Sequence, residues 1–161
     1  IPVGEIAFTM QTFAVFTAVG LLGTRCGTIC VVVYILIGAA GAPVFSNFTG
    51  GIGVLFGATG GYIIGFVFSA LLAGALMKRV PEISGKWQTV ALQALAMLAG
   101  LIVCYAFGTA WFVLVYAPRA AKSVTVLGAL SACVFPYILP DLCKIALALG
   151  LSRRLKPHIR L

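Results

Sequence analysis

Long uncharged runs of apolar residues make up most of this chain. No charged residue occurs between Arg25 and Lys78, or between Lys86 and Arg119. About 20 apolar residues are enough for a helix to cross the hydrocarbon core of a bilayer. The 52 residues between Arg25 and Lys78 are therefore too many for one crossing, and about right for two crossings with a loop between them.

These runs predict five membrane-spanning helices, which we place at residues 6–23, 27–40, 59–77, 87–118 and 123–151. The loop between the second and third helices is marked by Gly41, Pro43 and the cluster at residues 46–51. Within the last run we expect a partial helix to about Val134, a kink, and a final helix from about Pro140, because proline suits the first helical turn.

Composition agrees with an all-α, polytopic membrane protein that forms one domain over residues 1–161. Hydrophobic residues make up 62% of the chain and charged residues 9%, against about 25% charged in a soluble domain. Trp87 lies at one end of the fourth predicted helix, and Trp111 and Tyr116 lie near the other, as expected for interfacial aromatic belts.

Basic residues flank the apolar runs and are distributed unequally between the two sides. With five crossings, one side receives Arg25, Lys78, Arg79, Lys86, Arg153, Arg154, Lys156 and Arg160, and the other receives Arg119 and Lys122. The positive-inside rule then places the C-terminus in the cytoplasm and the glycine-rich loop outside the cell membrane. The net charge of +8 therefore indicates contact with anionic lipid, not with nucleic acid.

The same count places Ile1 outside, although no export signal precedes it. We therefore expect that one further helix lies N-terminal to Ile1, and that the sequence is truncated at this end.

Glycines recur every four residues through residues 50–66. Gly53, Gly57, Gly61 and Gly65 form the series, and Gly60 lies beside it. On a membrane helix such a series lets another helix backbone approach closely. We expect these glycines to pack helices and to shape a gating loop, and ordinary helix packing alone is the simpler alternative.

Asp141 and Lys144 are the strongest candidates for a ligand site. They are three residues apart and so share one helical face, and charges within the membrane face a cavity or a partner because they are costly in lipid. The alternative is a mutually neutralising pair that fixes the last helix. Gln11 and Thr12 either face the same cavity or hydrogen-bond between helices.

Two further residues are candidates for ligand contact. Tyr62 follows the Gly60–Gly61 pair and could present its ring or hydroxyl to a ligand, or lie in the interfacial belt. Asn47 begins an Asn-x-Thr sequon, but a role in shaping the loop is the better interpretation.

The motifs of common enzymes and metal sites are missing from the sequence. Asp141 is the one carboxylate within the predicted helices, the five cysteines form no CxxC, and His158 lies in the basic tail. The sequence has neither GxSxG nor GxxxxGK[ST]. We therefore expect no catalysis, metal or cofactor, and any use of ATP would require another chain.

Three blocks of sequence resemble one known family. FTMQTFAVFTAVGLLGTRCGT, YILIGAAGAPVFSNFTGGIGVLFGATGGYIIGF and FPYILPDLCK occur in the order found in the BioY family, the biotin-specific substrate-binding (S) components of energy-coupling-factor (ECF) transporters. The resemblance covers nearly the whole chain. It departs from the family pattern at Ala58, where a proline is usual, and at Pro140, where a glycine is usual.

The resemblance implies a six-helix fold of which the first helix is absent here. It implies capture of biotin from outside by a pocket containing Asp141 and Lys144, with a transmembrane coupling subunit and two ATP-binding subunits as partners. An S component for another vitamin, or a small channel or membrane scaffold with a structural Asp141–Lys144 pair, remains as an alternative.

Overall fold

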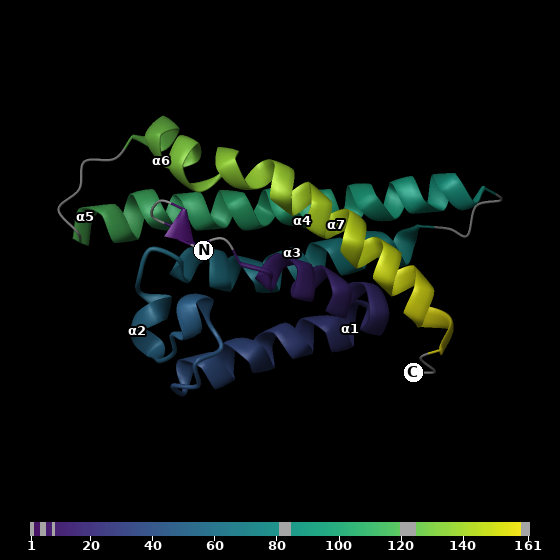
Figure 1. Ribbon diagram of the computed structural model, residues 1–161, viewed down its shortest axis with the longest axis horizontal. Coiled ribbons are helices and arrows are strands. Elements are labelled where there is room, and N and C mark those ends of the chain that lie inside the picture. The colour runs from purple at the N-terminus through teal and green to yellow at the C-terminus, as the bar shows by residue number, and fades with distance from the viewer. Residues whose placement is uncertain (1, 4–5, 8, 81–84, 120–124, 159–161) are drawn as a thin grey trace.

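The computed structural model describes residues 2–3, 6–7, 9–80, 85–119 and 125–158, and it is mainly helical (Figure 1). The longer helices are α1 (Gln11–Ala39), α3 (Gly60–Arg79), α4 (Lys86–Trp111) and α7 (Phe135–Leu155). The shorter elements are β1 (Pro2–Val3), β2 (Ile6–Ala7), η1 (Ser46–Phe48), α2 (Ile52–Leu55), η2 (Phe112–Tyr116), α5 (Ala117–Arg119), α6 (Val126–Cys133) and η3 (Lys156–His158).

Four of the helices in the described residues are long and apolar enough to cross a membrane, so the expected count of five is not confirmed. Most of the first two predicted helices falls within α1, which is broken at Gly23, where φ is 75° and ψ is −176°. The arm before Gly23 is only about 18 Å long at about 1.5 Å per residue, which is shorter than the hydrocarbon core of about 30 Å.

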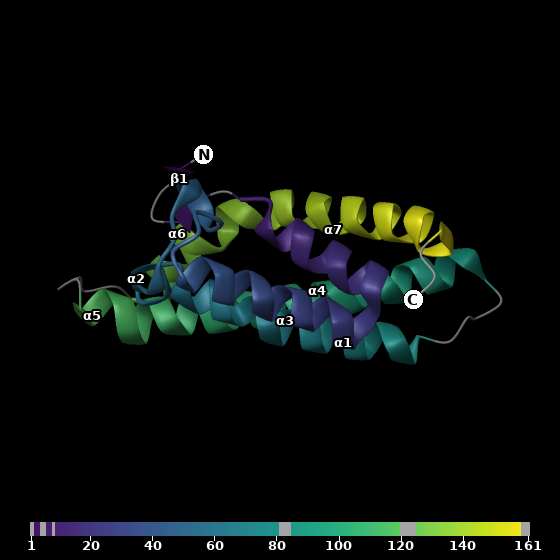
Figure 2. The same cartoon turned by 90° about the horizontal axis from the view of Figure 1, so that it is seen from below.

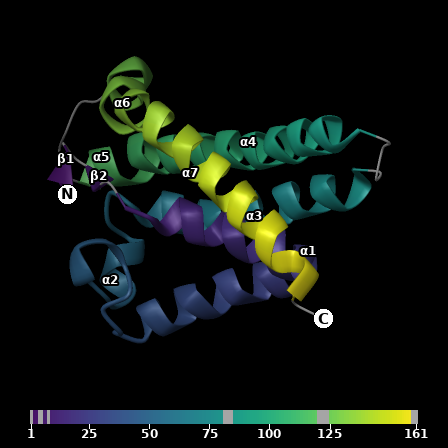
Figure 3. The ribbon, with the colours of Figure 1, turned by 45° about the vertical axis from the view of Figure 1, so that its right-hand side comes forward.

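The two arms of α1 fold back on each other at this break (Figures 1 and 3). A Cβ on Gly27 would lie 2.7 Å from the Cα of Val19, which shows how closely the arms approach. The prediction of helix from residue 6 was wrong at its start, because Ile6–Ala7 pairs with Pro2–Val3 as an antiparallel ladder and the helix begins at Gln11.

Helices α3 and α4 form the central pair of the bundle, and small residues line their contact. Gly61, Gly65, Ser69 and Ala73 on α3 are buried. A Cβ on Gly61 would lie 2.1 Å from the Cβ of Trp111, and one on Gly65 would lie 3.3 Å from the carbonyl oxygen of Cys104. Because this face of α3 carries only small side chains, the two helix backbones approach closely, as is common between membrane helices.

Helix α4 continues beyond its α-helical part without a turn. The π-helical segment Phe112–Tyr116 and the short α5 follow it, and the residues that flank this segment, Trp111 and Ala117, both keep right-handed helical angles. The predicted extent of this helix, residues 87–118, therefore agrees with the structure.

The C-terminal region breaks at Val134, as the sequence suggested, but its final helix begins earlier than predicted. Helix α6 ends at Cys133, Val134 leaves the helical region with φ −124° and ψ −56°, and α7 begins at Phe135. The prediction that the final helix begins at about Pro140 was wrong, because Pro136 occupies the first turn and Pro140 lies inside α7. A membrane helix tolerates an internal proline where neighbouring groups satisfy the freed backbone.

The two ends of the bundle differ in character (Figures 1 and 2). One end carries the break in α1, the end of α3 and the C-terminal end of α7; Lys78 and Arg79 lie in the last turn of α3, and Arg153 and Arg154 in that of α7. The other end carries β1, α2, α5 and α6. We refer to these as the basic end and the loop end.

Candidate functional site

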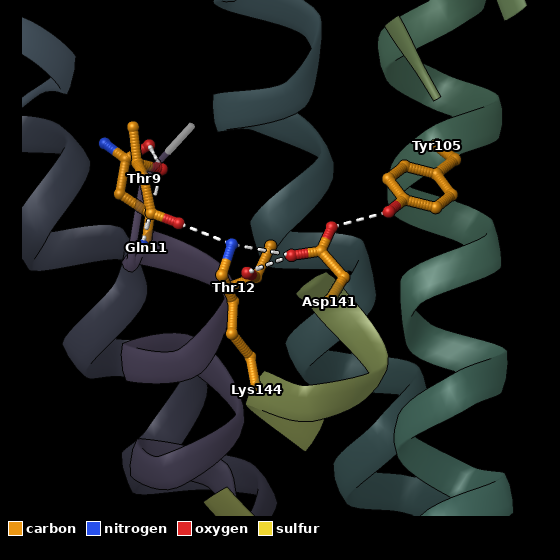
Figure 4. Close-up of polar contacts among 6 residues, drawn as sticks. All are labelled: Thr9, Gln11, Thr12, Tyr105, Asp141 and Lys144. Atoms are coloured by element: carbon orange, nitrogen blue, oxygen red, sulfur yellow. Dashed lines mark hydrogen bonds and ion pairs between the residues drawn. The ribbon is translucent and has the colours of Figure 1, made fainter. Parts of the chain in front are cut away.

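Asp141 is buried near the start of α7 and accepts hydrogen bonds from three side chains (Figure 4). Lys144 donates to Oδ1 over 2.7 Å and Thr12 donates to the same oxygen over 3.0 Å. The hydroxyl of Tyr105, on α4, donates to Oδ2. Side chains from three helices thus converge on one carboxylate.

Lys144 is one turn further along α7 and is buried to a similar extent. The exposed fractions of the two residues are 4% for Asp141 and 5% for Lys144. In addition to the ion pair, the Lys144 ammonium donates to the carbonyl oxygen of Thr9 over 2.6 Å. The segment before α1 is thereby tied to α7 across 135 residues of sequence.

Such burial is costly for charged groups unless both are paired and hydrogen-bonded. The contacts of Asp141 and Lys144 meet that requirement. Replacing such a pair by apolar residues of similar volume is often neutral or stabilising, so a purely structural role does not explain its presence well. This observation favours a role in binding.

A cavity opens directly onto this pair. Its lining is drawn from all the long helices, from α6, and from the segments before α1 and between α1 and α3: Thr9, Gln11, Thr12, Ser46, Thr59, Tyr62, Ile63, Phe66, Cys104, Tyr105, Cys133, Tyr137, Asp141 and Lys144. The cavity therefore combines aromatic and aliphatic walls with a small polar group at one side, which is the usual make-up of a small-molecule site. Ser46 and Cys133 place it towards the loop end.

The free volume of the cavity is about 60 Å³. Ligand pockets in proteins usually measure about 300–1,000 Å³. In this conformation the cavity therefore has room for little more than water, and any larger ligand requires side chains or loops to move.

Besides Asp141 and Lys144, two of the expected contact residues line the cavity and one does not. Gln11 lines it and donates to the hydroxyl of Tyr34. Tyr62 lines it, and its hydroxyl lies 3.4 Å from that of Thr109. Asn47 is exposed and is not part of the lining, whereas its neighbour Ser46 is. With φ of 57°, Asn47 occupies the left-handed region that asparagine tolerates better than most residues.

The glycines of the four-residue series lie in different surroundings. Gly61 and Gly65 face α4, as described above, and a Cβ on Gly60 would lie 1.8 Å from the carbonyl oxygen of Leu55. The carbonyl oxygen of Gly57 accepts a hydrogen bond of 3.2 Å from the indole of Trp111. Among the described atoms, a Cβ on Gly53 would meet none within 4 Å.

The Trp111 contact changes the interpretation of that residue. The sequence suggested an interfacial belt, but its indole binds the loop before α3 and its Cβ packs on Gly61. Trp87, in contrast, is 86% exposed at the start of α4, as a belt residue would be.

Sequence reasoning missed Tyr105 and Thr9 as parts of the site. Tyr105 lies in the middle of an uncharged run. A polar hydroxyl inside a predicted membrane helix was the signal that could have identified it as part of the site. Thr9 contributes a backbone carbonyl, which no residue pattern can reveal.

A largely apolar cavity with a buried ion pair, inside a bundle of membrane-length helices, defines a multi-pass membrane protein with a candidate internal site. The sequence model of the BioY family matches residues 1–161, so the chain belongs to the BioY family. The resemblance of its three sequence blocks is thus confirmed.

Named relatives and a solved structure agree with this assignment. The chain is 38% identical to the biotin transporter BioY of Thermotoga maritima, over 97% of this chain and 84% of the relative. It is 33% identical to the probable biotin transporter BioY of Pyrococcus horikoshii, over the same shares. The structure matches a crystal structure of the S-component for biotin from an ECF-type ABC transporter with a TM-score of 0.82 and 26% identity, covering 98% of this chain and 79% of that one.

Proposed function

We propose that this protein captures biotin from outside the cell as the S component of an ECF transporter. The observation that carries the proposal is the buried Asp141–Lys144 pair at the wall of an otherwise largely apolar cavity. The names of its BioY relatives and of the structurally matched S-component support the same ligand.

The chemistry of the pair suits the ureido ring of biotin. That ring offers two N–H donors and one carbonyl acceptor. Oδ2 of Asp141, which accepts from Tyr105, retains capacity for a second donor, because a carboxylate oxygen can accept more than one hydrogen bond. The Lys144 ammonium would donate to the ureido carbonyl, and walls such as Ile63 and Phe66 would cover the apolar part of the ligand.

Admission of biotin requires the small cavity to expand. Thr9 and Ser46 line it from outside the long helices, and the carbonyl oxygen of Thr9 accepts a hydrogen bond from Lys144. We propose that these two segments move apart when biotin binds, and that the ligand then replaces the contact between Lys144 and Thr9. Gly53 in α2 and Gly57 belong to the segment that would move, and Gly60 begins α3 at its end.

The orientation and partners follow from the same proposal. The basic end, with Lys78, Arg79 and Arg153, is proposed to face the cytoplasm together with the C-terminus, and the cavity then opens towards the outside. Import would depend on a transmembrane coupling subunit and two ATP-binding subunits. A fifth crossing would come from the two arms of α1 counted separately.

Calorimetric titration of the detergent-purified protein with biotin tests the proposal. Hydrogen bonds to charged groups contribute about 1.5–3 kcal/mol, so Asp141→Asn and Lys144→Ala should each weaken binding by roughly 10- to 100-fold. Cys143→Ala is the matched control, because Cys143 lies between them on α7 but is exposed and does not line the cavity. Thermal unfolding of each variant checks that the fold is kept.

Three results would contradict the proposal in different ways. Absence of saturable biotin binding by the unmodified protein would favour a channel or scaffold. Displacement by another vitamin but not by biotin would indicate an S component of different specificity. A larger loss from Cys143→Ala than from Asp141→Asn would show that another face of α7 meets the ligand.

A further inference from the structure

A second cavity lies at the basic end, away from the Asp141–Lys144 pair. Its volume is about 310 Å³, and it is lined by Val19, Gly20, Gly23, Thr24, Arg25, Gly74, Met77, Lys78, Gln93 and Lys156. The lining comes from the break in α1, the end of α3, the first half of α4 and η3, which follows α7. None of these residues lines the first cavity.

Three cationic side chains from distant parts of the sequence meet at this cavity. Arg25, Lys78 and Lys156 all line it, and all three are exposed. Within the described residues, no hydrogen bond or ion pair engages the side chain of any of the three. Like charges brought together without a partner repel one another, so an anion in the cavity would be attracted by all three.

The fold brings these charges together through specific backbone features. The positive φ of Gly23 breaks α1 and thereby places Thr24 and Arg25 beside α3. Gly74 allows this approach, because a Cβ there would lie 2.8 Å from the Cα of Thr24. The arrangement is therefore built by tertiary packing and is more than a group of basic residues near a helix end.

We propose that this second cavity binds the phosphate of an anionic membrane lipid. A phosphate diester carries a negative charge and several acceptor oxygens, which match the donors of Arg25, Lys78 and Lys156 together with the hydroxyl of Thr24. The amide of Gln93 is held at the cavity by a 3.1 Å hydrogen bond from Arg153. Basic pockets between membrane helices on the cytoplasmic side are typical sites for such headgroups.

The apolar part of the lining favours a lipid over free phosphate. Val19 and Met77 line the same cavity as the cations, and Gly20 and Gly74 add no polar side-chain atoms. A free phosphate ion would gain nothing from an apolar surface, whereas a lipid can place its phosphate at the cations and its glycerol and upper acyl chain against these residues. The bound lipid would join α1, α3 and the C-terminal segment.

Native mass spectrometry of the detergent-purified protein, titrated with phosphatidylglycerol or with phosphatidylcholine, tests the proposal. We expect the first phosphatidylglycerol to bind at least tenfold more tightly than phosphatidylcholine. Arg25→Gln combined with Lys78→Gln should weaken that first binding step by roughly tenfold or more, since each basic residue near a lipid surface contributes appreciably. Arg79→Gln combined with Arg154→Gln is the matched control, because it removes the same charge from exposed residues that do not line the cavity.

The outcomes distinguish the possible ligands. A selective loss in the Arg25–Lys78 pair, with no competition by inorganic phosphate, supports a lipid site. Full displacement of phosphatidylglycerol by inorganic phosphate would overturn the lipid assignment and leave a site for free phosphate. Equal losses in both variant pairs, or equal binding of the two lipids, would overturn the proposal, because binding would then reflect general charge alone.

Discussion

At the scale of single residues, the environment of Asp141 decides what the site can do. The carboxylate is engaged by Thr12 and Lys144 at one oxygen and by Tyr105 at the other. These donors come from three different helices, so the position of the carboxylate depends on how the helices pack. Removing the Tyr105 hydroxyl leaves the ion pair intact and changes only the contact at Oδ2.

Tyr105→Phe is therefore predicted to weaken biotin binding while keeping the fold. The substitution removes one hydroxyl that donates to Oδ2 and leaves the aromatic ring in the cavity wall. A hydrogen bond to a charged group contributes about 1.5–3 kcal/mol, so we expect a loss of roughly tenfold, measured by calorimetric titration.

The control for this substitution is Tyr116→Phe, which lies beyond the cavity lining on the same continuous helix. Unchanged affinity in Tyr105→Phe would show that the orientation of Asp141 does not depend on this hydroxyl.

At the scale of elements, the contact between α3 and α4 positions the loop end. Gly61 has no side chain and so leaves room for Trp111 beside it. The indole N–H of Trp111 donates a hydrogen bond to the carbonyl oxygen of Gly57. A missing side chain on one helix thus positions an aromatic residue on the next, which in turn holds the loop before α3. Thr59 and Tyr62, both in the cavity lining, lie on either side of this glycine.

Gly61→Ala is predicted to destabilise the protein, because its Cβ would overlap the Cβ of Trp111 at 2.1 Å. Overpacking of this kind costs about 1–3 kcal/mol, which should appear as a lower midpoint of thermal unfolding in detergent.

Gly53→Ala is the matched control within the same series of glycines. Its Cβ would meet no described atom within 4 Å, and alanine is the better helix former, so stability should be unchanged or slightly increased. Equal destabilisation by both substitutions would show that the whole series packs helices, as the sequence first suggested.

At the scale of the whole molecule, the two ends carry different chemistry. The cavity beside Asp141 and Lys144 lies towards the loop end, and the cations gather at the basic end, where three of them line a second cavity. Membrane proteins commonly show the same asymmetry between their two sides, because segments rich in Lys and Arg stay in the cytoplasm. The shape of the molecule and the proposed direction of transport therefore agree.

Cysteine labelling in intact cells tests this orientation. In a variant without the five native cysteines, Phe48→Cys should react with a membrane-impermeant maleimide added outside, because Phe48 is 89% exposed at the loop end. Arg154→Cys, in the last turn of α7, should react only after the cells are permeabilised. The opposite pattern would place the cavity on the cytoplasmic side.

Much of the fold could be predicted because the positions of membrane-spanning helices depend mainly on local composition. Uninterrupted apolar runs are predicted as helices from length alone, and the extent of α4 with its continuation agrees with that expectation. The boundaries of α1 and α7 could not be predicted in this way. A break at Gly23 and the choice between Pro136 and Pro140 depend on which neighbours satisfy the backbone.

The sequence by itself determined that this is a helical membrane protein, that it resembles the BioY family, and that Asp141 and Lys144 share one helical face. Each of these depends on composition, motif or local spacing. Only the tertiary structure decided that Tyr105 and the Thr9 carbonyl complete the polar group, that Asn47 lies outside the cavity, and that Arg25, Lys78 and Lys156 meet. The physical reason is that contacts between distant segments depend on helix packing, which local spacing does not encode.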